Sequence, residues 1–147
     1  MNRKSIISIL VVLASVLMLG SCESAFPDDR LDFYWRLDRV EFKDGVDFQN
    51  QPCQYNDIYD VMFGFARHIV QVEDLTNEFS RHGVTTDMGD SIRFDFSMYP
   101  ASDTEYIMTE FRKCGLDSLV TTFKVDYPDR KHLVLSGRKT ILRLRKW

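Results

Sequence analysis

Hydrophobic and polar residues alternate along most of the chain after residue 31, which is the pattern of strands with one buried face. The clearest run is 91–99, where Ile92, Phe94, Phe96 and Met98 are expected to share the buried face. Less regular runs of the same kind cover 32–42, 58–65, 68–75, 78–86, 119–127, 132–136 and 139–146. The pattern therefore predicts an all-β domain of about eight strands.

The first of these strands contains a break in the pattern. Its apolar phase stops after Leu37 and resumes at Val40, which predicts a β-bulge near Asp38–Arg39. The residues that follow, 43–56, are mostly polar and include a glycine and a proline. We therefore expect a long loop between the first and second strands, whereas the later strands are joined by short turns.

A single helix is expected over 103–114, where the apolar spacing becomes four residues, as between Ile107 and Phe111. Asp103 is the expected N-cap and Gly115 the expected C-cap. Eight strands with one helix before the last three suit a closed antiparallel up-and-down barrel. A two-sheet β-sandwich is the alternative.

The first 22 residues match a bacterial lipoprotein signal. Two basic residues precede an apolar run over 6–19, and Leu19-Gly20-Ser21-Cys22 then places small residues before a cysteine. The expected product is a chain that begins at an acylated Cys22. A transmembrane anchor is the alternative, but an apolar run of about 14 residues is shorter than the roughly 20 that a spanning helix needs.

Lipidation of Cys22 sets the expected organisation of the chain. Residues 1–21 are then a signal peptide, 22–30 a short polar tether, and 31–147 a single β domain without internal repeats. We expect the lipid anchor to hold the protein in the cell envelope, at the outer membrane. The sequence leaves open whether the domain faces the periplasm or the cell surface.

The net charge argues against a nucleic-acid partner. The whole chain carries −3, and loss of Arg3 and Lys4 with the signal peptide takes it to −5, whereas nucleic-acid-binding domains are usually basic. From Arg130 onward, however, there are seven Lys or Arg residues and no acid. This basic segment either faces anionic lipid headgroups or an acidic partner, or forms the solvated outer face of two strands.

Two cysteines remain besides Cys22. A disulfide between Cys53 and Cys114 would close a loop of about 60 residues and add on the order of 4 kcal/mol in the chain-entropy model. Pairing is favoured because Cys53 lies in a polar loop outside the cytoplasm. Two unpaired buried thiols are the alternative.

Two segments at the ends of the β domain carry a family resemblance. They are Tyr34-Trp35-Arg36-Leu37 in the first strand and the basic Leu142-Arg143-Leu144-Arg145-Lys146-Trp147 at the end. In these the chain resembles the lipocalin-like (calycin) lipoproteins of Bacteroidetes-type bacteria. The resemblance implies a lipocalin-like barrel in which a late arginine, Arg143 or Arg145, packs across Trp35 and seals one end.

Catalytic and metal-binding patterns do not occur in the sequence. The histidines, His68, His82 and His132, are scattered and form no metal-ligand spacing. There is no nucleophile elbow or phosphate-binding glycine loop, and Asp87-Met88-Gly89-Asp90 is predicted to be a turn. We therefore expect no catalytic residues, no metal and no cofactor, and we do not expect an enzyme.

Aromatic residues are abundant, with eleven Phe, six Tyr and two Trp. If the strands close into a barrel, a set of them is expected to line a pocket for a lipid or another small apolar molecule. These residues are Trp35, Phe63, Phe65, Phe94, Phe96, Met98 and Phe123. The alternative is a filled core. The protein would then be a non-catalytic module that docks another envelope protein or a glycan-handling complex, with Tyr55, Tyr59 and the 43–57 loop as contact elements.

Overall fold

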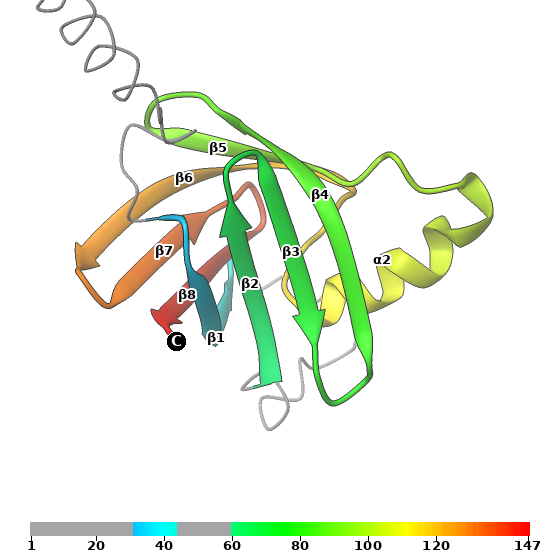
Figure 1. The fold of residues 1–147 in the computed structure, drawn as a ribbon, viewed down its shortest axis with the longest axis horizontal. Coiled ribbons are helices and arrows are strands. Elements are labelled where there is room, and N and C mark those ends of the chain that lie inside the picture. The colour runs from blue at the N-terminus through cyan, green and yellow to red at the C-terminus, as the bar shows by residue number, and fades with distance from the viewer. Residues whose placement is uncertain (1–30, 44–59) are drawn as a thin grey trace, which may run out of the picture.

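Eight antiparallel strands close into a barrel in the computed structural model, which describes residues 31–43 and 60–147. Each strand pairs with the next along the chain, and the last returns to pair with the first (Figure 1). The elements are β1 (Tyr34–Phe42), β2 (Val61–Ala66), β3 (Ile69–Asp74), β4 (Phe79–Asp87), β5 (Ser91–Asp95), the short 3₁₀ helix η5 (Ala101–Asp103), α2 (Thr104–Lys113), β6 (Val120–Asp129), β7 (His132–Ser136) and β8 (Thr140–Lys146). The predicted up-and-down barrel with one helix is confirmed, and the β-sandwich alternative is wrong.

The barrel closes through a long ladder between β1 and β8. Residues 35–42 of β1 pair with residues 140–146 of β8, with a shift of register between Leu37 and Arg39. This shift confirms the bulge predicted from the break in the apolar pattern. Because of the extra residue, Leu37 and Val40 are both buried although they are three positions apart.

The strand predicted over 91–99 ends early, at Asp95. The Asp95 carboxylate accepts hydrogen bonds from the backbone N–H (3.0 Å) and the hydroxyl (2.6 Å) of Ser97, which turns the chain. The Ser97 hydroxyl also holds the pKa of Asp95 below its ordinary value, so the carboxylate stays ionised as an acceptor. Met98 therefore lies in a turn and is 59 % exposed, and its predicted place on the buried face is wrong.

The early end of β5 leaves one edge of β4 without its neighbouring strand. β5 pairs with β4 only at residues 84–87, so residues 79–83 of β4 have no β5 partner. The side chain of Tyr99 takes the place of β5 at this edge. Its hydroxyl accepts a hydrogen bond from the His82 N–H (2.9 Å) and donates one to the His82 carbonyl (3.0 Å). One side chain thus makes both hydrogen bonds that a paired strand would make at His82.

Helix α2 covers the same gap from the side. Its residues Ile107 and Phe111 are fully buried, as the spacing predicted. The Phe111 ring packs edge-on against Phe79 of β4 and Phe96, with centroids 5.8 Å and 4.6 Å away. The Asp103 side chain, the predicted cap, makes no capping hydrogen bond. The helix is therefore held mainly by its apolar face.

The C-terminal end of α2 is a Schellman motif. The Leu116 N–H donates to the Phe111 carbonyl (2.9 Å), and Gly115 between them has φ +83°, a conformation that glycine adopts at least cost. A Cβ atom on Gly115 would lie 2.5 Å from Cδ2 of Leu142 and 3.1 Å from the Val40 methyl carbons. The end of the helix is thus packed tightly against the inner faces of β8 and β1.

Replacing Gly115 by alanine is expected to lower the free energy of unfolding by about 2–3 kcal/mol. Roughly 1 kcal/mol comes from the left-handed backbone, and the rest from crowding against Leu142 and Val40. Urea unfolding measures this loss. Gly89→Ala is the matched control, because Gly89 also has positive φ (+92°) but would meet nothing within 4 Å. Equal losses in the two variants would show that the crowding does not exist.

The two ends of the barrel differ. Leu116 and α2 lie at the end where β1 finishes and β8 begins. The β2–β3, β4–β5 and β6–β7 turns and the end of β8 lie at the other end, which α2 does not cover (Figure 1). We refer to this end, opposite α2, as the open end. The chain enters the barrel there, since the Trp35 indole N–H donates to the carbonyl of the buried Leu31 (3.3 Å).

Candidate functional site

Six of the seven predicted pocket residues face the barrel interior. Each is at most 4 % exposed, and they are Trp35, Phe63, Phe65, Phe94, Phe96 and Phe123. They come from β1, β2, β5, β6 and the residue after β5. Met98 is the exception, on the outside turn described above. The fold therefore brings most of the predicted lining together.

The interior aromatic rings are in contact with one another. The Phe94 ring centroid lies 5.7 Å from that of Phe65, 5.2 Å from Phe123 and 6.4 Å from Phe96, and Phe96 continues the series to Phe111. These are the separations of packed aromatic pairs. Side chains therefore fill the interior from Phe65, near the end of β2, to Phe111 of α2.

A buried hydroxyl without a hydrogen-bond partner lies beside this aromatic cluster. Thr85 of β4 is 2 % exposed and pairs with Phe94 across the ladder, on the inward-facing side of the strand. Among the described residues, nothing hydrogen-bonds its Oγ1. Thr140, which is equally buried, donates its hydroxyl to the Gly115 carbonyl (2.8 Å). A buried hydroxyl without a partner costs about 1–3 kcal/mol.

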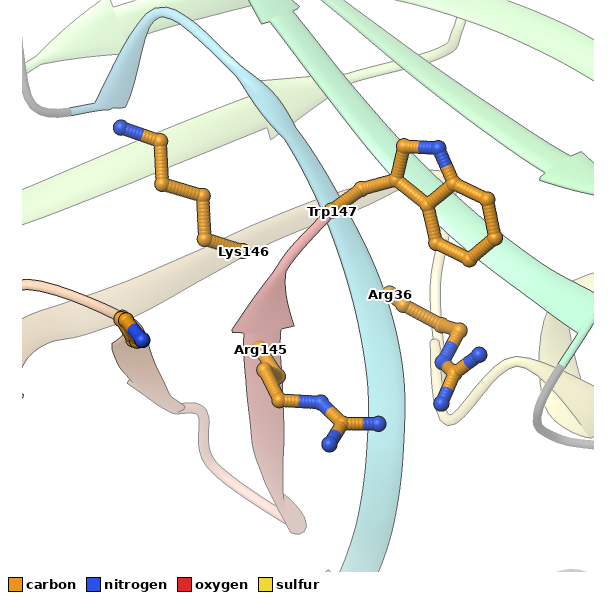
Figure 2. A pocket seen from close by; sticks show the side chains of 5 residues that line it. Arg36, Arg145, Lys146 and Trp147 are labelled. Atoms are coloured by element: carbon orange, nitrogen blue, oxygen red, sulfur yellow. The ribbon is translucent and has the colours of Figure 1, made fainter.

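A basic groove opens on the outer wall at the open end. It has a volume of about 490 Å³, and it is lined by Arg36, Lys131, Arg145, Lys146 and Trp147 (Figure 2). The Arg36 guanidinium lies 5.5 Å from the Trp147 ring centroid, and Lys146 Nζ lies 3.3 Å from that of Phe33. The side chains of Lys146 and Trp147 extend to opposite sides of the strand end (Figure 2). We call these five residues, together with Phe33 and Tyr34, the basic rim.

The open end also carries most of the exposed apolar side chains. Nine large hydrophobic residues are exposed in the described part of the chain, and six of them lie at this end: Phe33, Tyr34, Ile69, Val84, Met88 and Trp147. Ile69 and Val84 stand directly opposite each other on β3 and β4. Trp147 is 75 % exposed. The open end thus carries more exposed large apolar residues than the rest of the described surface.

Arg143 and Arg145 do not seal the barrel over Trp35. Both project from the outer face of β8, where Arg143 Nε lies 2.8 Å from Oε1 of Glu41 and Arg145 Nε lies 3.5 Å from Oδ2 of Asp38. The hydrogen bond from Arg143 holds the pKa of Glu41 below its ordinary value. Trp35 faces the interior, so the sheet separates it from both arginines, and the predicted contact is wrong.

The sequence did not indicate Thr85 or the convergence of Arg36 with Lys131 and Trp147. Lys131 and Lys146 belong to the basic segment that begins at Arg130, but Arg36 reaches them only because β8 closes on β1. Thr85 lies in a weakly alternating run, and its hydroxyl has no sequence signature. The tertiary fold, and not the local sequence, therefore determines both the burial of Thr85 and the convergence of the basic side chains.

Several predicted residues lie outside the described part of the chain. They include Cys22, Cys53, Tyr55 and Tyr59. Lipidation of Cys22 therefore stays a prediction. So does the disulfide, although its second cysteine, Cys114, is fully buried just after α2.

The histidines stay apart in the fold. His132 Nδ1 lies 2.7 Å from Oδ2 of Asp129, and no group of three or more metal-ligating side chains forms within residues 31–43 and 60–147. In the same residues, no helix has the length and apolar character needed to cross a bilayer.

Comparison with known proteins places these features in a family context. Residues 17–147 match the model of a family described as a lipocalin-like domain. The fold is similar to the crystal structure of a lipocalin-like protein from Bacteroides uniformis (TM-score 0.59, 19 % identity), with 80 % of this chain and 99 % of that chain aligned. An uncharacterised protein from Bacteroides eggerthii is similar over the same shares of the two chains (TM-score 0.53, 19 % identity). No curated protein matches the sequence. At such identities the structural matches establish the fold alone.

Proposed function

The chain belongs to the lipocalin-like domain family, and from this premise we propose that it is a lipid-anchored envelope protein that binds a small, mainly apolar molecule through the open end of its barrel. The observation that carries the proposal is the Thr85 hydroxyl, which is buried, inward-facing and without a partner among the described residues. A bound molecule with an apolar body and one polar group would satisfy it. Domains of this fold are usually non-catalytic, and the proposed role is binding.

The size of the ligand is limited by the packed aromatic rings. The rings of Phe65, Phe94, Phe96 and Phe111 fill the interior from the level of Thr85 to α2, so a ligand is confined to the part of the barrel beyond Phe94, toward the open end. Aliphatic residues face inward there, among them Ile92, Leu133 and Leu144. This environment suits a short acyl chain or a single ring system rather than a large polycyclic molecule.

Membrane attachment of the binding domain is proposed from the sequence of the N-terminus. Leu19-Gly20-Ser21-Cys22 provides the acylation signal, and residues 23–30 provide a polar connection to the barrel. A ligand that is mainly apolar partitions into membranes, so an anchored binding domain would meet it at the bilayer surface.

Native mass spectrometry of the full chain purified from membranes tests ligand binding. We expect a small organic molecule to remain bound in the native spectrum and to be released on denaturation. N-phenyl-1-naphthylamine, an apolar fluorescent probe, should bind the delipidated protein and be displaced by the extracted molecule. If the protein carries no molecule and does not bind the probe, the binding proposal is wrong.

Thr85→Val should raise stability and weaken ligand binding. Valine removes the hydroxyl that lacks a partner, so the free energy of unfolding without ligand should rise by about 1 kcal/mol. Less of the extracted molecule should copurify, because its polar group loses a hydrogen bond. Thr140→Val is the matched control, since Thr140 is equally buried but bonded, and it should lose about 1 kcal/mol. Urea unfolding distinguishes the two variants, and a loss of stability in Thr85→Val would contradict the assignment.

A non-catalytic docking module is the second candidate function. It is favoured by the exposed apolar residues at the open end, which include Ile69, Val84 and Met88. In that case the domain would hold another envelope protein or a glycan-handling complex at the membrane. Absence of a bound small molecule, together with crosslinking of an envelope protein to residues of the open end, would support this second function over the first.

A further inference from the structure

We infer that the basic rim is a membrane-docking surface that contacts the anionic headgroups of the bilayer in which Cys22 is anchored. The inference rests on the proposed lipid anchor and adds the orientation of the barrel: the open end faces the membrane. The rim combines Phe33, Tyr34 and Trp147 with the cations of Arg36, Lys131, Arg145 and Lys146.

The path of the chain favours this orientation. Leu31 is packed at the open end, where the Trp35 indole donates to its carbonyl, and only the eight residues 23–30 lie between Cys22 and Leu31. The nine Cα-to-Cα steps from Cys22 to Leu31 reach about 30 Å when fully extended. The nine-residue strand β1 is about 30 Å long, and with the tilt of barrel strands it rises roughly 23 Å along the barrel axis. An orientation with α2 toward the membrane would therefore use most of the tether to pass the barrel. With the open end toward the membrane, the tether does not have to span the length of the barrel.

The chemistry of the rim fits a bilayer surface. Trp and Tyr side chains prefer the boundary between headgroups and hydrocarbon, and Trp147 and Tyr34 are 75 % and 50 % exposed. The Arg36 and Lys146 cations lie against the Trp147 and Phe33 rings, so these two rings are each presented beside a positive charge. When such a ring enters the interface, the cation beside it is placed to bind an anionic headgroup.

Charge alone does not choose between the two ends of the barrel. The β7–β8 turn at the other end also carries cations, Arg138 and Lys139. On the rim, Asp38 lies 3.5 Å from Arg145 and offsets part of its charge. The distinguishing feature of the open end is that exposed aromatic residues and cations share one surface. That combination fits a lipid headgroup layer better than a purely ionic partner.

Tryptophan fluorescence provides a direct test, because the chain has only Trp35 and Trp147 and Trp35 is 1 % exposed. The full-length lipidated protein, purified in detergent, is reconstituted into phosphatidylcholine vesicles with or without 30 % phosphatidylglycerol. In the anionic vesicles, Trp147 emission should shift to the blue and its quenching by acrylamide should fall roughly threefold. Trp147→Phe should abolish both changes.

Charge reversal separates docking from anchoring. Lys131→Glu with Lys146→Glu should return the quenching toward its value in neutral vesicles and reduce the docked population roughly tenfold. Arg138→Glu with Lys139→Glu is the matched control, with the same charge change at the other end, and should leave docking intact. Protein that floats with the vesicles while Trp147 stays fully quenchable overturns the docking inference alone. Protein that does not float has no anchor, and the anchor and the docking inference are then both wrong.

Discussion

Phe94→Ala is expected to lower the free energy of unfolding by about 3–5 kcal/mol, the largest stability effect of any single substitution considered for this protein. The Phe94 ring is fully buried and packs against the rings of Phe65, Phe96 and Phe123. Its removal loses the transfer free energy of the ring and leaves a cavity that these large, stiff neighbours fill poorly. Urea unfolding followed by circular dichroism measures the loss.

Two further variants calibrate this effect. Phe94→Leu keeps most of the volume and should lose about 1–1.5 kcal/mol. Phe33→Ala removes the same ring from a site that is 44 % exposed and should change stability by only about 0.5 kcal/mol. A loss below about 1.5 kcal/mol in Phe94→Ala would mean that the ring borders open space, which would extend the ligand pocket toward α2.

Cys22→Ser is expected to abolish lipid attachment. An acyl chain gains about 0.8 kcal/mol per buried CH₂, so one chain binds a membrane reversibly and several chains on one residue bind firmly. Without the thiol, neither acylation nor cleavage before residue 22 should occur. Cells grown with labelled palmitate should show a labelled wild-type band and an unlabelled, larger band for the variant.

The control for this experiment is the same substitution at another cysteine. Cys53→Ser should incorporate palmitate as the wild type does, because its thiol is not part of the signal sequence. Labelling of Cys22→Ser at the wild-type level would show that the anchor lies elsewhere or that the band is labelled nonspecifically. The proposed tether to the barrel would then be wrong.

The fold could be predicted from the sequence because local pattern and global structure agree. The strict alternation in β5 predicted that Ile92 and Phe94 face the barrel interior, and both are buried. The break in the apolar pattern after Leu37 coincides with the β-bulge observed in β1. The change to helical spacing between Ile107 and Phe111 marks the one α-helix of the described residues. In each case one face of a single element must be buried, so the periodicity carries the information.

The candidate site was less predictable because it depends on individual side chains. Alternation continues through Met98, but the hydrogen bonds from Ser97 to Asp95 end the strand first. The outward direction of Arg143 and Arg145 follows from the register of β8, which a family motif does not specify. Contacts between residues far apart in the sequence, such as those of the basic rim, arise only when the barrel closes.

The hydrogen bonds of Tyr99 have a consequence for the solubility of the protein. A closed barrel has no free strand edges, but residues 79–83 of β4 would present one wherever β5 has ended. An edge of this kind can pair with the same edge of a second molecule and start aggregation or strand exchange. The Tyr99 hydroxyl occupies both backbone groups of His82, and α2 covers the adjacent Phe79. This short segment before the helix thus protects an interrupted part of the described β-ladder from pairing with a second molecule.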